Sequence, residues 1–314
     1  MSAPGRPGTA LVIGEALVDV VIHPGAEPVD IPGGSPANVA LGLARLGRDA
    51  ELDCWIATDP RGRAIRSHLE ASGVRLTPGA DAAERTSTAQ ATIGADRAAT
   101  YVFDLDWNPP YPHRPEGAEA PLLVHTGSIA AILEPGRATV EQVLRDHRET
   151  STICYDPNAR PQLMGSPEQA REIVEGLIAL TDLVKCSDED ITWLYGADAD
   201  LESVLRDWLG LGAAVVVVTR GKKGALALTS SGLRLEVPAD PDVVVADTVG
   251  AGDSFMGGLE DALWSEDLVG ADRREALHAL DAAALERIVR HAAAIADITV
   301  SRAGANPPTR DELP

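Results

Sequence analysis

The sequence lacks three features that mark common classes of protein: runs of basic residues, paired cysteines and a long apolar stretch. Its 27 lysines and arginines stand against 48 aspartates and glutamates, for a formal net charge of −21, and no basic run occurs. Because nucleic acids and anionic membranes are held by clustered Lys and Arg, the charge argues against both as partners. An acidic protein can still bind a nucleotide through backbone amides, a few cations and a metal ion.

The cysteines, Cys54, Cys154 and Cys186, are odd in number, far apart and without C-x-x-C spacing. They predict buried thiols in a reducing compartment, not a disulfide scaffold or a zinc site. The longest uninterrupted apolar run is "GAAVVVV", which is too short to span a bilayer, and Gly14 and Glu15 interrupt the N-terminal segment, unlike a signal peptide. We therefore expect a soluble, cytoplasmic protein.

Strand-like and helical segments alternate along most of the chain. The strand-like segments include "ALVIG", "ELDCWIA", "LLVHTGS", "STICYD", "TDLVKC" and "AAVVVVTR", and the helical ones include "PANVALGLARLG" and "PRGRAIRSHLEASG". Strands that are apolar throughout are typical of a parallel sheet covered on both faces by helices. The pattern predicts an α/β fold, doubly wound around a mostly parallel central sheet, in a single domain over residues 1–314.

Two regions have a different period. The segment "ALVDVVIHPG" and the pair "TSTAQATIG" and "ATYVFDLDW" alternate apolar with polar residues, as strands with one wet face do, and "GADRA" predicts a hairpin turn within the pair. We expect these segments, about residues 16–34 and 86–108, to form a small sheet that projects from the main domain and covers a ligand. The alternative is that they are edge strands of the main sheet.

The stretch "DTVGAGDSFMGGL" begins at Asp247, follows the strand-like "DVVVA" and precedes an apolar-periodic helix. A Gly-Ala-Gly turn at a helix start lets backbone N–H groups converge, and the helix dipole adds positive potential, so an anion hole is predicted. A carboxylate at Asp253 would repel a phosphate that the site binds but does not transfer. It fits if Asp253 removes the proton of an incoming hydroxyl while the amides hold the transferring phosphoryl group. The alternative is that Asp253 only caps the helix.

Together these motifs resemble those of the ribokinase-like sugar kinases, the PfkB carbohydrate kinase family. The resemblance covers nearly the whole chain and is greatest to fructokinase-like members. It implies a large doubly wound domain, a small β-sheet lid, a sugar held between them and ATP along the C-terminal edge of the main sheet. The matching stretches, in the family's order, are "GGSPANVALGLARLG", "HTGSIA", "YDPNARPQL", "LVKCSDEDITWLYG", "VVVVTRGKKGALAL", "DTVGAGDSFMGGL" and "VSRAGANPPTRDEL".

The resemblance implies roles for the residues that match these motifs. Asp253 is implied as the catalytic base and Arg160 as a group that reaches the substrate or the transferred phosphate. The anion hole is implied to consist of the amides of Gly250, Ala251 and Gly252. Sugar hydroxyls are assigned to Asp19, Gly33, Gly34 and Asn38. The nucleotide is assigned to Thr219, Gly221, Gly224, Lys185 and Gly252, with residues 292–304 completing the adenine wall.

The family's Asn-x-x-Glu motif, which organises magnesium and phosphate, falls here on Ser187 and Asp190, both shorter than the usual residues. Asp190 is assigned to Mg²⁺, directly or through water, with Glu189 as the alternative ligand and helix capping as the alternative role of Ser187. Val249 and Pro308 stand where potassium-dependent members carry side-chain oxygens. We therefore expect MgATP as co-substrate and little or no dependence on a monovalent cation.

The predicted function is an ATP-dependent sugar kinase that phosphorylates a primary hydroxyl of a hexose, most simply fructose. Met164 in place of a frequent tryptophan, and a lid strand without the arginine common in fructokinases, leave the sugar open. The alternatives are 2-keto-3-deoxygluconate, which should need a second cation near the lid, a nucleoside, which should need an aromatic shelf such as Trp107 or Tyr101, or another polyol. A catalytically silent sugar-binding or regulatory protein is the alternative from another class. Because related kinases often bury the free face of the lid between two copies, a homodimer is expected.

Overall fold

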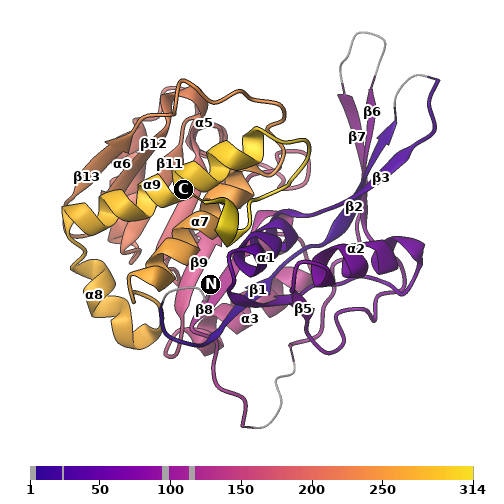
Figure 1. The fold of residues 1–314 in the computed structure, drawn as a ribbon, viewed down its shortest axis with the longest axis horizontal. Helices are drawn as coiled ribbons and strands as arrows, with labels where there is room; N and C mark the ends of the chain where they lie inside the picture. The colour runs from indigo at the N-terminus through magenta and orange to yellow at the C-terminus, as the bar shows by residue number, and fades with distance from the viewer. Residues whose placement is uncertain (1–4, 23–24, 94–98, 113–116, 314) are drawn as a thin grey trace.

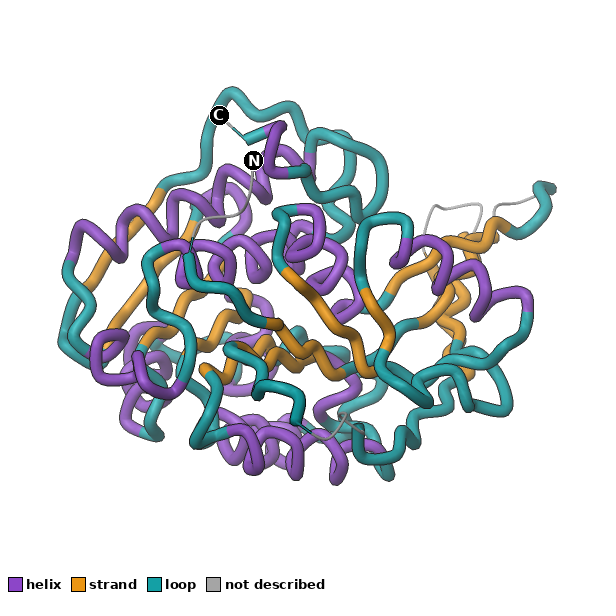
Figure 2. The backbone as a smooth tube through the Cα atoms, turned by 60° about the horizontal axis from the view of Figure 1, so that its bottom comes forward, coloured by secondary structure: helices purple, strands orange, loops and turns teal. Residues whose placement is uncertain are grey.

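The computed structural model describes residues 5–22, 25–93, 99–112 and 117–313. Its main body is a sheet with helices on both faces, from which a smaller sheet projects (Figures 1 and 2). The main sheet, within these residues, has nine strands in the order β13-β12-β11-β10-β9-β8-β1-β4-β5. The strands are β1 (Thr9–Ile13), β4 (Asp49–Asp53), β5 (Arg75–Leu76), β8 (Leu123–Gly127), β9 (Thr152–Asp156), β10 (Leu183–Ser187), β11 (Val215–Thr219), β12 (Ala225–Thr229) and β13 (Arg234–Val237).

Pairing in the main sheet is parallel from β5 across to β11, and β12 and β13 are added antiparallel at one edge. The order of the strands reverses beside β1, because β4 lies on one side of it and β8 on the other. In open α/β sheets, ligands bind outside the carboxyl ends of the strands at such a reversal. The predicted doubly wound, mostly parallel fold is confirmed, and its topology directs attention to this edge.

Helices cover both faces of the main sheet. One core cluster joins one face to α1, α2, α7, α8 and α9, and a second joins the other face to α3, α4, α5 and α6. The helices are α1 (Ser35–Arg45), α2 (Pro60–Glu70), α3 (Gly136–His147), α4 (Pro167–Ile178), α5 (Asp188–Tyr195), α6 (Leu201–Gly210), α7 (Ala251–Ser265), α8 (Arg274–His278) and α9 (Ala282–Val300). Four short 3-10 turns of the described chain are η1 (Ser128–Ala131), η2 (Gly221–Lys223), η3 (Ala271–Arg273) and η4 (Arg310–Glu312).

Local sequence accounts for several helix starts. Asp59 accepts a hydrogen bond from the amide of Gly62 at the start of α2, and Asp281 accepts one from Ala284 at the start of α9. These side chains satisfy amides that have no partner within the helix. All three cysteines are buried thiols, as predicted. No helix of the described chain has both the length and the apolar character needed to cross a membrane.

The small sheet has the strand order β3-β2-β6-β7, with β2 (Leu17–Ile22), β3 (Val29–Gly33), β6 (Thr88–Ile93) and β7 (Ala99–Asp104). It is separate from the main sheet, so the alternative of edge strands is wrong (Figure 1). The strands lie within the predicted ranges 16–34 and 86–108, whereas the predicted "GADRA" turn lies at 94–98, outside the described residues. That these strands act as a lid, and that residues 1–314 form one domain, stay predictions.

The segment "DVVVA" before α7, residues 242–246, was predicted as a strand and is not one. Pro238 and Pro241 both precede it, and proline has no N–H to donate to a neighbouring strand. The amide of Ala246 bonds the carbonyl of Val300, and Val244 is largely exposed. This apolar stretch is therefore a surface loop that leads from β13 to the start of α7.

Candidate active site

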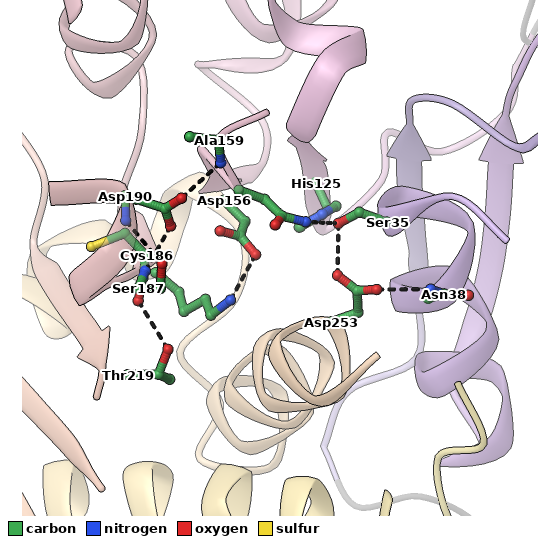
Figure 3. Close-up of polar contacts among 12 residues, drawn as sticks. Ser35, Asn38, His125, Asp156, Ala159, Cys186, Ser187, Asp190, Thr219 and Asp253 are labelled. Carbon is green, nitrogen blue, oxygen red and sulfur yellow. Dashed lines mark hydrogen bonds and ion pairs between the residues drawn. The ribbon is translucent and has the colours of Figure 1, made fainter. Parts of the chain in front are cut away.

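The start of α7 lies at the carboxyl edge of the main sheet, beside the ends of β9 and β10 (Figure 3). Its N-cap, Gly250, has a left-handed backbone with φ 74°, which favours glycine. The amides of Gly250 and Gly252 donate to no acceptor among the described residues, while that of Ala251 donates to the carbonyl of Thr248 at 3.2 Å. Backbone amides without an acceptor at a helix N-terminus can bind an anion. The amide of Ala251 can contribute to this site only if its long hydrogen bond to Thr248 breaks.

Gly252 also makes room for a cation. A Cβ at Gly252 would lie 2.7 Å from Nζ of Lys185. Lys185 is buried in the middle of β10, and its Nζ lies 2.9 Å from Oδ2 of Asp156. Burial by itself lowers the pKa of Lys185, but the Asp156 carboxylate outweighs burial and raises the pKa above its usual value. Burial raises the pKa of Asp156 to about 6, although Lys185 opposes the shift. The structure therefore places an ammonium group beside the free amides.

Asp253 is 7% exposed and is held from two sides (Figure 3). The hydroxyl of Ser35 donates to its Oδ1 at 2.7 Å and the amide of Asn38 donates to its Oδ2 at 2.8 Å. The N-cap of α7 is Gly250, and Asp253 makes no capping bond. The alternative that Asp253 is only a helix cap is therefore not what the structure shows, and Asn38, predicted to bind sugar, directly contacts the candidate base.

A chain of hydrogen bonds runs from Asp253 toward Arg160. Ser35, which bonds Asp253, accepts from Nδ2 of Asn158 at 2.7 Å, and Oδ1 of Asn158 accepts from Arg160 at 2.7 Å. Asn158 has a positive φ of 39°, a conformation that asparagine tolerates better than most residues. Ser35 and Asn158 were missed from sequence, although both lie inside motifs that the resemblance rests on, "GGSPANVALGLARLG" and "YDPNARPQL".

Asp19, Gly33 and Gly34 come together where β2 and β3 meet α1. A Cβ at Gly33 would collide with Oδ2 of Asp19, and one at Gly34, which has φ 107°, would collide with the carbonyl of Glu15. Burial raises the pKa of Asp19 to about 6, with Arg160 lowering it and Asp253 raising it. The charges of Arg160 and Asp253 both act on the pKa of Asp19, so Asp19 lies near these two residues. The predicted sugar site requires this proximity.

Glu15 is a further carboxylate of this group, which sequence reasoning missed. Its Oε2 accepts from the amide of Ala130 at 3.1 Å, so it ties the end of β1 to η1. Burial raises the pKa of Glu15 to about 7, while bonds to Ser128 and Ala130 and the charge of Arg160 lower it. The only signal in the sequence was an acidic residue directly after a buried strand. Solvated loops carry an acidic residue at this position as often, so the signal is not specific.

Comparison with known proteins identifies the group. The model of the family "pfkB family carbohydrate kinase" matches residues 9–312. This chain belongs to that family. The resemblance predicted from its motifs is thereby confirmed, and the protein is a phosphotransferase that acts on an alcohol group.

Individual relatives are similar to this carbohydrate kinase over most of its length. A fructokinase of Klebsiella pneumoniae is 34% identical over 257 residues, which cover 80% of this chain and 83% of the relative. A fructokinase double mutant of Vibrio cholerae O395, solved with fructose, ADP and a potassium ion, is 25% identical with a TM-score of 0.76, covering 96% and 94% of the two chains. An aminoimidazole riboside kinase of Salmonella enterica is 26% identical with a TM-score of 0.76, covering 97% of each chain.

Three of the predicted nucleotide residues of this carbohydrate kinase lie at the end of β11 and in the turn after it. The hydroxyl of Thr219 donates to the carbonyl of Cys186 at 3.3 Å, and Gly221 and Gly224 have φ 50° and 80° in the turn to β12. A surface depression of about 430 Å³ lies between the loop before α7 and the last turns of α9; its lining residues are Asp240, Val243, Val244, Ala294, Asp297, Ile298 and Ser301. Four of these fall within residues 292–304, the predicted adenine wall, but the nucleotide contacts themselves stay predictions.

The predicted metal residue, Asp190, has a local role. Its Oδ1 accepts from the amide of Ala159 and its Oδ2 from that of Ser187, each at 2.7 Å, and Ser187 returns the bond as N-cap of α5. The capping role considered for Ser187 is thus present, and Glu189 is exposed. Among the described residues no three His, Cys, Asp or Glu side chains converge as a metal cluster. The assignment of Asp190 to Mg²⁺ stays a prediction.

Proposed function

We propose that this carbohydrate kinase transfers the γ-phosphoryl group of ATP to the primary hydroxyl of fructose. The observation that carries the proposal is Asp253: a buried carboxylate, held by Ser35 and Asn38, next to the free amides at the start of α7. Asp253 takes the hydroxyl proton as the sugar oxygen bonds to the γ-phosphorus. The bond from that phosphorus to the β–γ bridging oxygen breaks, and ADP leaves. The chain's part in this is positioning and charge stabilisation.

The other groups have distinct parts in the proposal. The amides of Gly250 and Gly252 and the ammonium of Lys185 hold the transferring phosphoryl group. Asp19, Gly33, Gly34 and Asn38 hold sugar hydroxyls, and Arg160 reaches substrate or phosphate from the chain of hydrogen bonds that ends at Asp253.

One buried carboxylate oxygen makes this site suitable for magnesium. Oδ1 of Asp156 is buried and accepts no hydrogen bond within the described part of the chain. Asp156 and Asp190 would hold the ion through water, as suits Mg²⁺, which keeps several waters and binds mainly through substrate phosphates. When bound, Mg²⁺ neutralises phosphate charge.

The choice of fructose rests on the Klebsiella pneumoniae relative, named a fructokinase. The similarity to the Salmonella enterica riboside kinase keeps a nucleoside as the second candidate. Trp107, considered as an aromatic shelf, is 5% exposed and donates its indole N–H to Ala130, so it belongs to the core; the side chain of Tyr101 lies outside the described residues. Arg85, near the lid strands, pairs with Asp104 and Asp106, which disfavours a sugar acid.

The test is ADP release over a panel of fructose, other hexoses, 2-keto-3-deoxygluconate and nucleosides. Fructose should give the highest kcat/KM. A higher value for a nucleoside would replace fructose by the second candidate, and no turnover of any acceptor, with sugar binding retained, would favour the silent sugar-binding protein.

Sugar binding should weaken in acid. The charged carboxylate of Asp19 is the better acceptor for a sugar hydroxyl, and its pKa is about 6, so binding is complete above that pH and declines below it. Each pH unit further down should raise KM for the sugar by at most about tenfold, the limit for one proton. Asp19→Asn should remove this limb of the KM profile. A profile with the same limb in the variant would assign it to another group.

Potassium should activate this kinase weakly or not at all. Asp247 accepts from the amides of Val249 and Gly304, and these bonds hold the pKa of Asp247 below its usual range. Its carboxylate therefore ties the loop before α7 to the C-terminal turn, and Pro308 offers no side-chain oxygen there. The rate should be the same with potassium as with a bulky organic cation. A clear increase with potassium would contradict the expectation.

A homodimer through the small sheet is the remaining proposal. Val29 and Ile31 on β3 are 52% and 45% exposed, and the register with β2 puts Ile31 on the same face as Asp19. Burying this apolar face would be favourable. Light scattering at micromolar concentration should give a dimer mass, and charged residues at Val29 and Ile31 should convert it to monomer. A monomer mass for the unaltered chain would exclude the dimer at that concentration.

A further inference from the structure

Glu260 and His125 form a buried pair beneath the candidate base. Oε1 of Glu260 on α7 lies 2.7 Å from Nδ1 of His125 on β8, and both side chains are 0% exposed. Glu260 follows Asp253 by seven residues, close to two turns of helix, so the two carboxylates lie on the same side of α7. The mechanism proposed above uses neither member of the pair.

Glycines occupy the middle of helix α7, where it packs against α1 and α9. A Cβ at Gly258 would lie 2.7 Å from Cα of Ala292 on α9, and one at Gly257 would lie 3.7 Å from the carbonyl of Val39 on α1. The helix therefore packs closely against both neighbours without side chains at these positions. Packing fixes the register of two helices by fitting side-chain ridges into grooves, and glycines supply no ridge. Polar bonds add to the restraint: Asp261 pairs with Arg48, His291 and Arg310 on one side of α7. The bond of Glu260 to His125 is the one that joins α7 to the sheet at β8.

Nearby carboxylates favour the protonated form of His125, whereas its buried Nε2 has no hydrogen-bond partner among the described residues. Burial by itself lowers the pKa of His125, but the carboxylate of Glu260, followed by those of Asp156 on β9 and Asp253 on α7, raises it above its usual value. Cys154, opposite His125 in the β8 and β9 register, is also close to Glu260; burial, with Glu260 adding to it, raises the pKa of its thiol, which stays neutral. His125 therefore contacts the carboxylate of Glu260, and the charges of Asp156 and Asp253 also raise its pKa.

We propose that His125 and Glu260 are positioning residues of the phosphoryl transfer: their buried ion pair fixes α7 on β8 and so holds Asp253 at the sugar hydroxyl. The proposal rests on the function proposed above, with Asp253 as base. Both members act through Asp253 and touch neither substrate nor nucleotide. The pair is strongest while His125 carries its proton, so its contribution is complete below the ordinary pKa of histidine and is lost as pH rises through the raised pKa of His125.

The test is Glu260→Gln, which keeps the shape of the side chain and removes its charge. We expect kcat to fall by about tenfold to 10²-fold, because small misplacements of a catalytic group have effects of this size. KM for sugar and ATP should change little. The alkaline fall of kcat should also move to lower pH, because His125 loses its main carboxylate. His125→Gln should lower kcat and abolish that part of the profile.

Asp182→Asn is the matched control. Asp182 is also a buried carboxylate, bonded by Arg148 and Arg274, but it precedes β10 at the opposite edge of the sheet. Its variant should lose stability and keep the kcat and pH profile of the unaltered enzyme. If Glu260→Gln behaves in the same way, the pair is only structural and the positioning role is wrong.

Imidazole ¹⁵N spectra of the unaltered enzyme provide a readout that does not depend on the variants folding. The titration of His125 should coincide with the alkaline fall of kcat, and a His125 that titrates at or below the ordinary pKa of histidine would overturn the proposal. Failure of Asp253 as base would appear separately, in the kinetics of its own variant, and would leave the protonation of His125 as measured.

Discussion

Asp253→Asn should lower kcat by about 10²–10⁴-fold, the usual contribution of a positioned base. The substitution preserves shape but removes the proton acceptor from between Ser35 and Asn38. The affinities for sugar and ATP, measured by calorimetry, should change little because the amides at Gly250 and Gly252 remain. An interaction made only in the transition state affects kcat in this way.

The control for Asp253 is a carboxylate that does cap a helix. Asp281 accepts from the amide of Ala284 at 2.8 Å at the start of α9. Asp281→Ala should reduce the free energy of unfolding by about 0.5–2 kcal/mol and leave kcat unchanged. If Asp253→Asn instead kept more than about a tenth of the wild-type kcat, the loss would be smaller than even the low end of a base's usual contribution. The base would then be another residue.

Lys185→Met should reduce the free energy of unfolding by about 3–5 kcal/mol, because it leaves the buried Asp156 carboxylate without its partner. Stability should partly return as pH falls, since protonation of Asp156 removes the unpaired charge. The pKa of Asp156 is already raised to about 6 with Lys185 present, and it should rise further without it. Urea unfolding at pH 5.5 and pH 8 measures both effects, and equal stability losses at the two pH values would contradict this account.

The double variant Lys185→Met with Asp156→Leu separates stability from nucleotide binding. Removing both charges of a buried pair is often close to neutral for stability, so the double variant should be more stable than the single one. KM for ATP should stay raised by about tenfold or more in both, because both lose a charged hydrogen bond to phosphate and the double variant also loses the carboxylate proposed to hold Mg²⁺. Recovery of ATP affinity together with stability would show that Lys185 has only a structural role.

Local sequence patterns were sufficient for most of the fold. Apolar runs such as Val215–Thr219 predicted buried parallel strands, because a strand covered on both faces has no polar side. The exception was 242–246, which has the composition of a strand but lies on the surface. Composition shows only which side chains a strand could bury, whereas pairing also needs a neighbouring strand. The two prolines before this segment remove backbone N–H donors that such pairing would use.

The sequence by itself determined the family, the glycine-rich helix start at Gly250 and the identity of the candidate base, because each depends on residues close together in the chain. Only the tertiary structure decided which groups surround that base. Ser35 lies 218 positions from Asp253, and Lys185 meets Asp156 across 29. Which side chains meet at the carboxyl edge depends on the order of the strands in the sheet, and a buried charge acquires its partner and its pKa only when that order brings distant segments together.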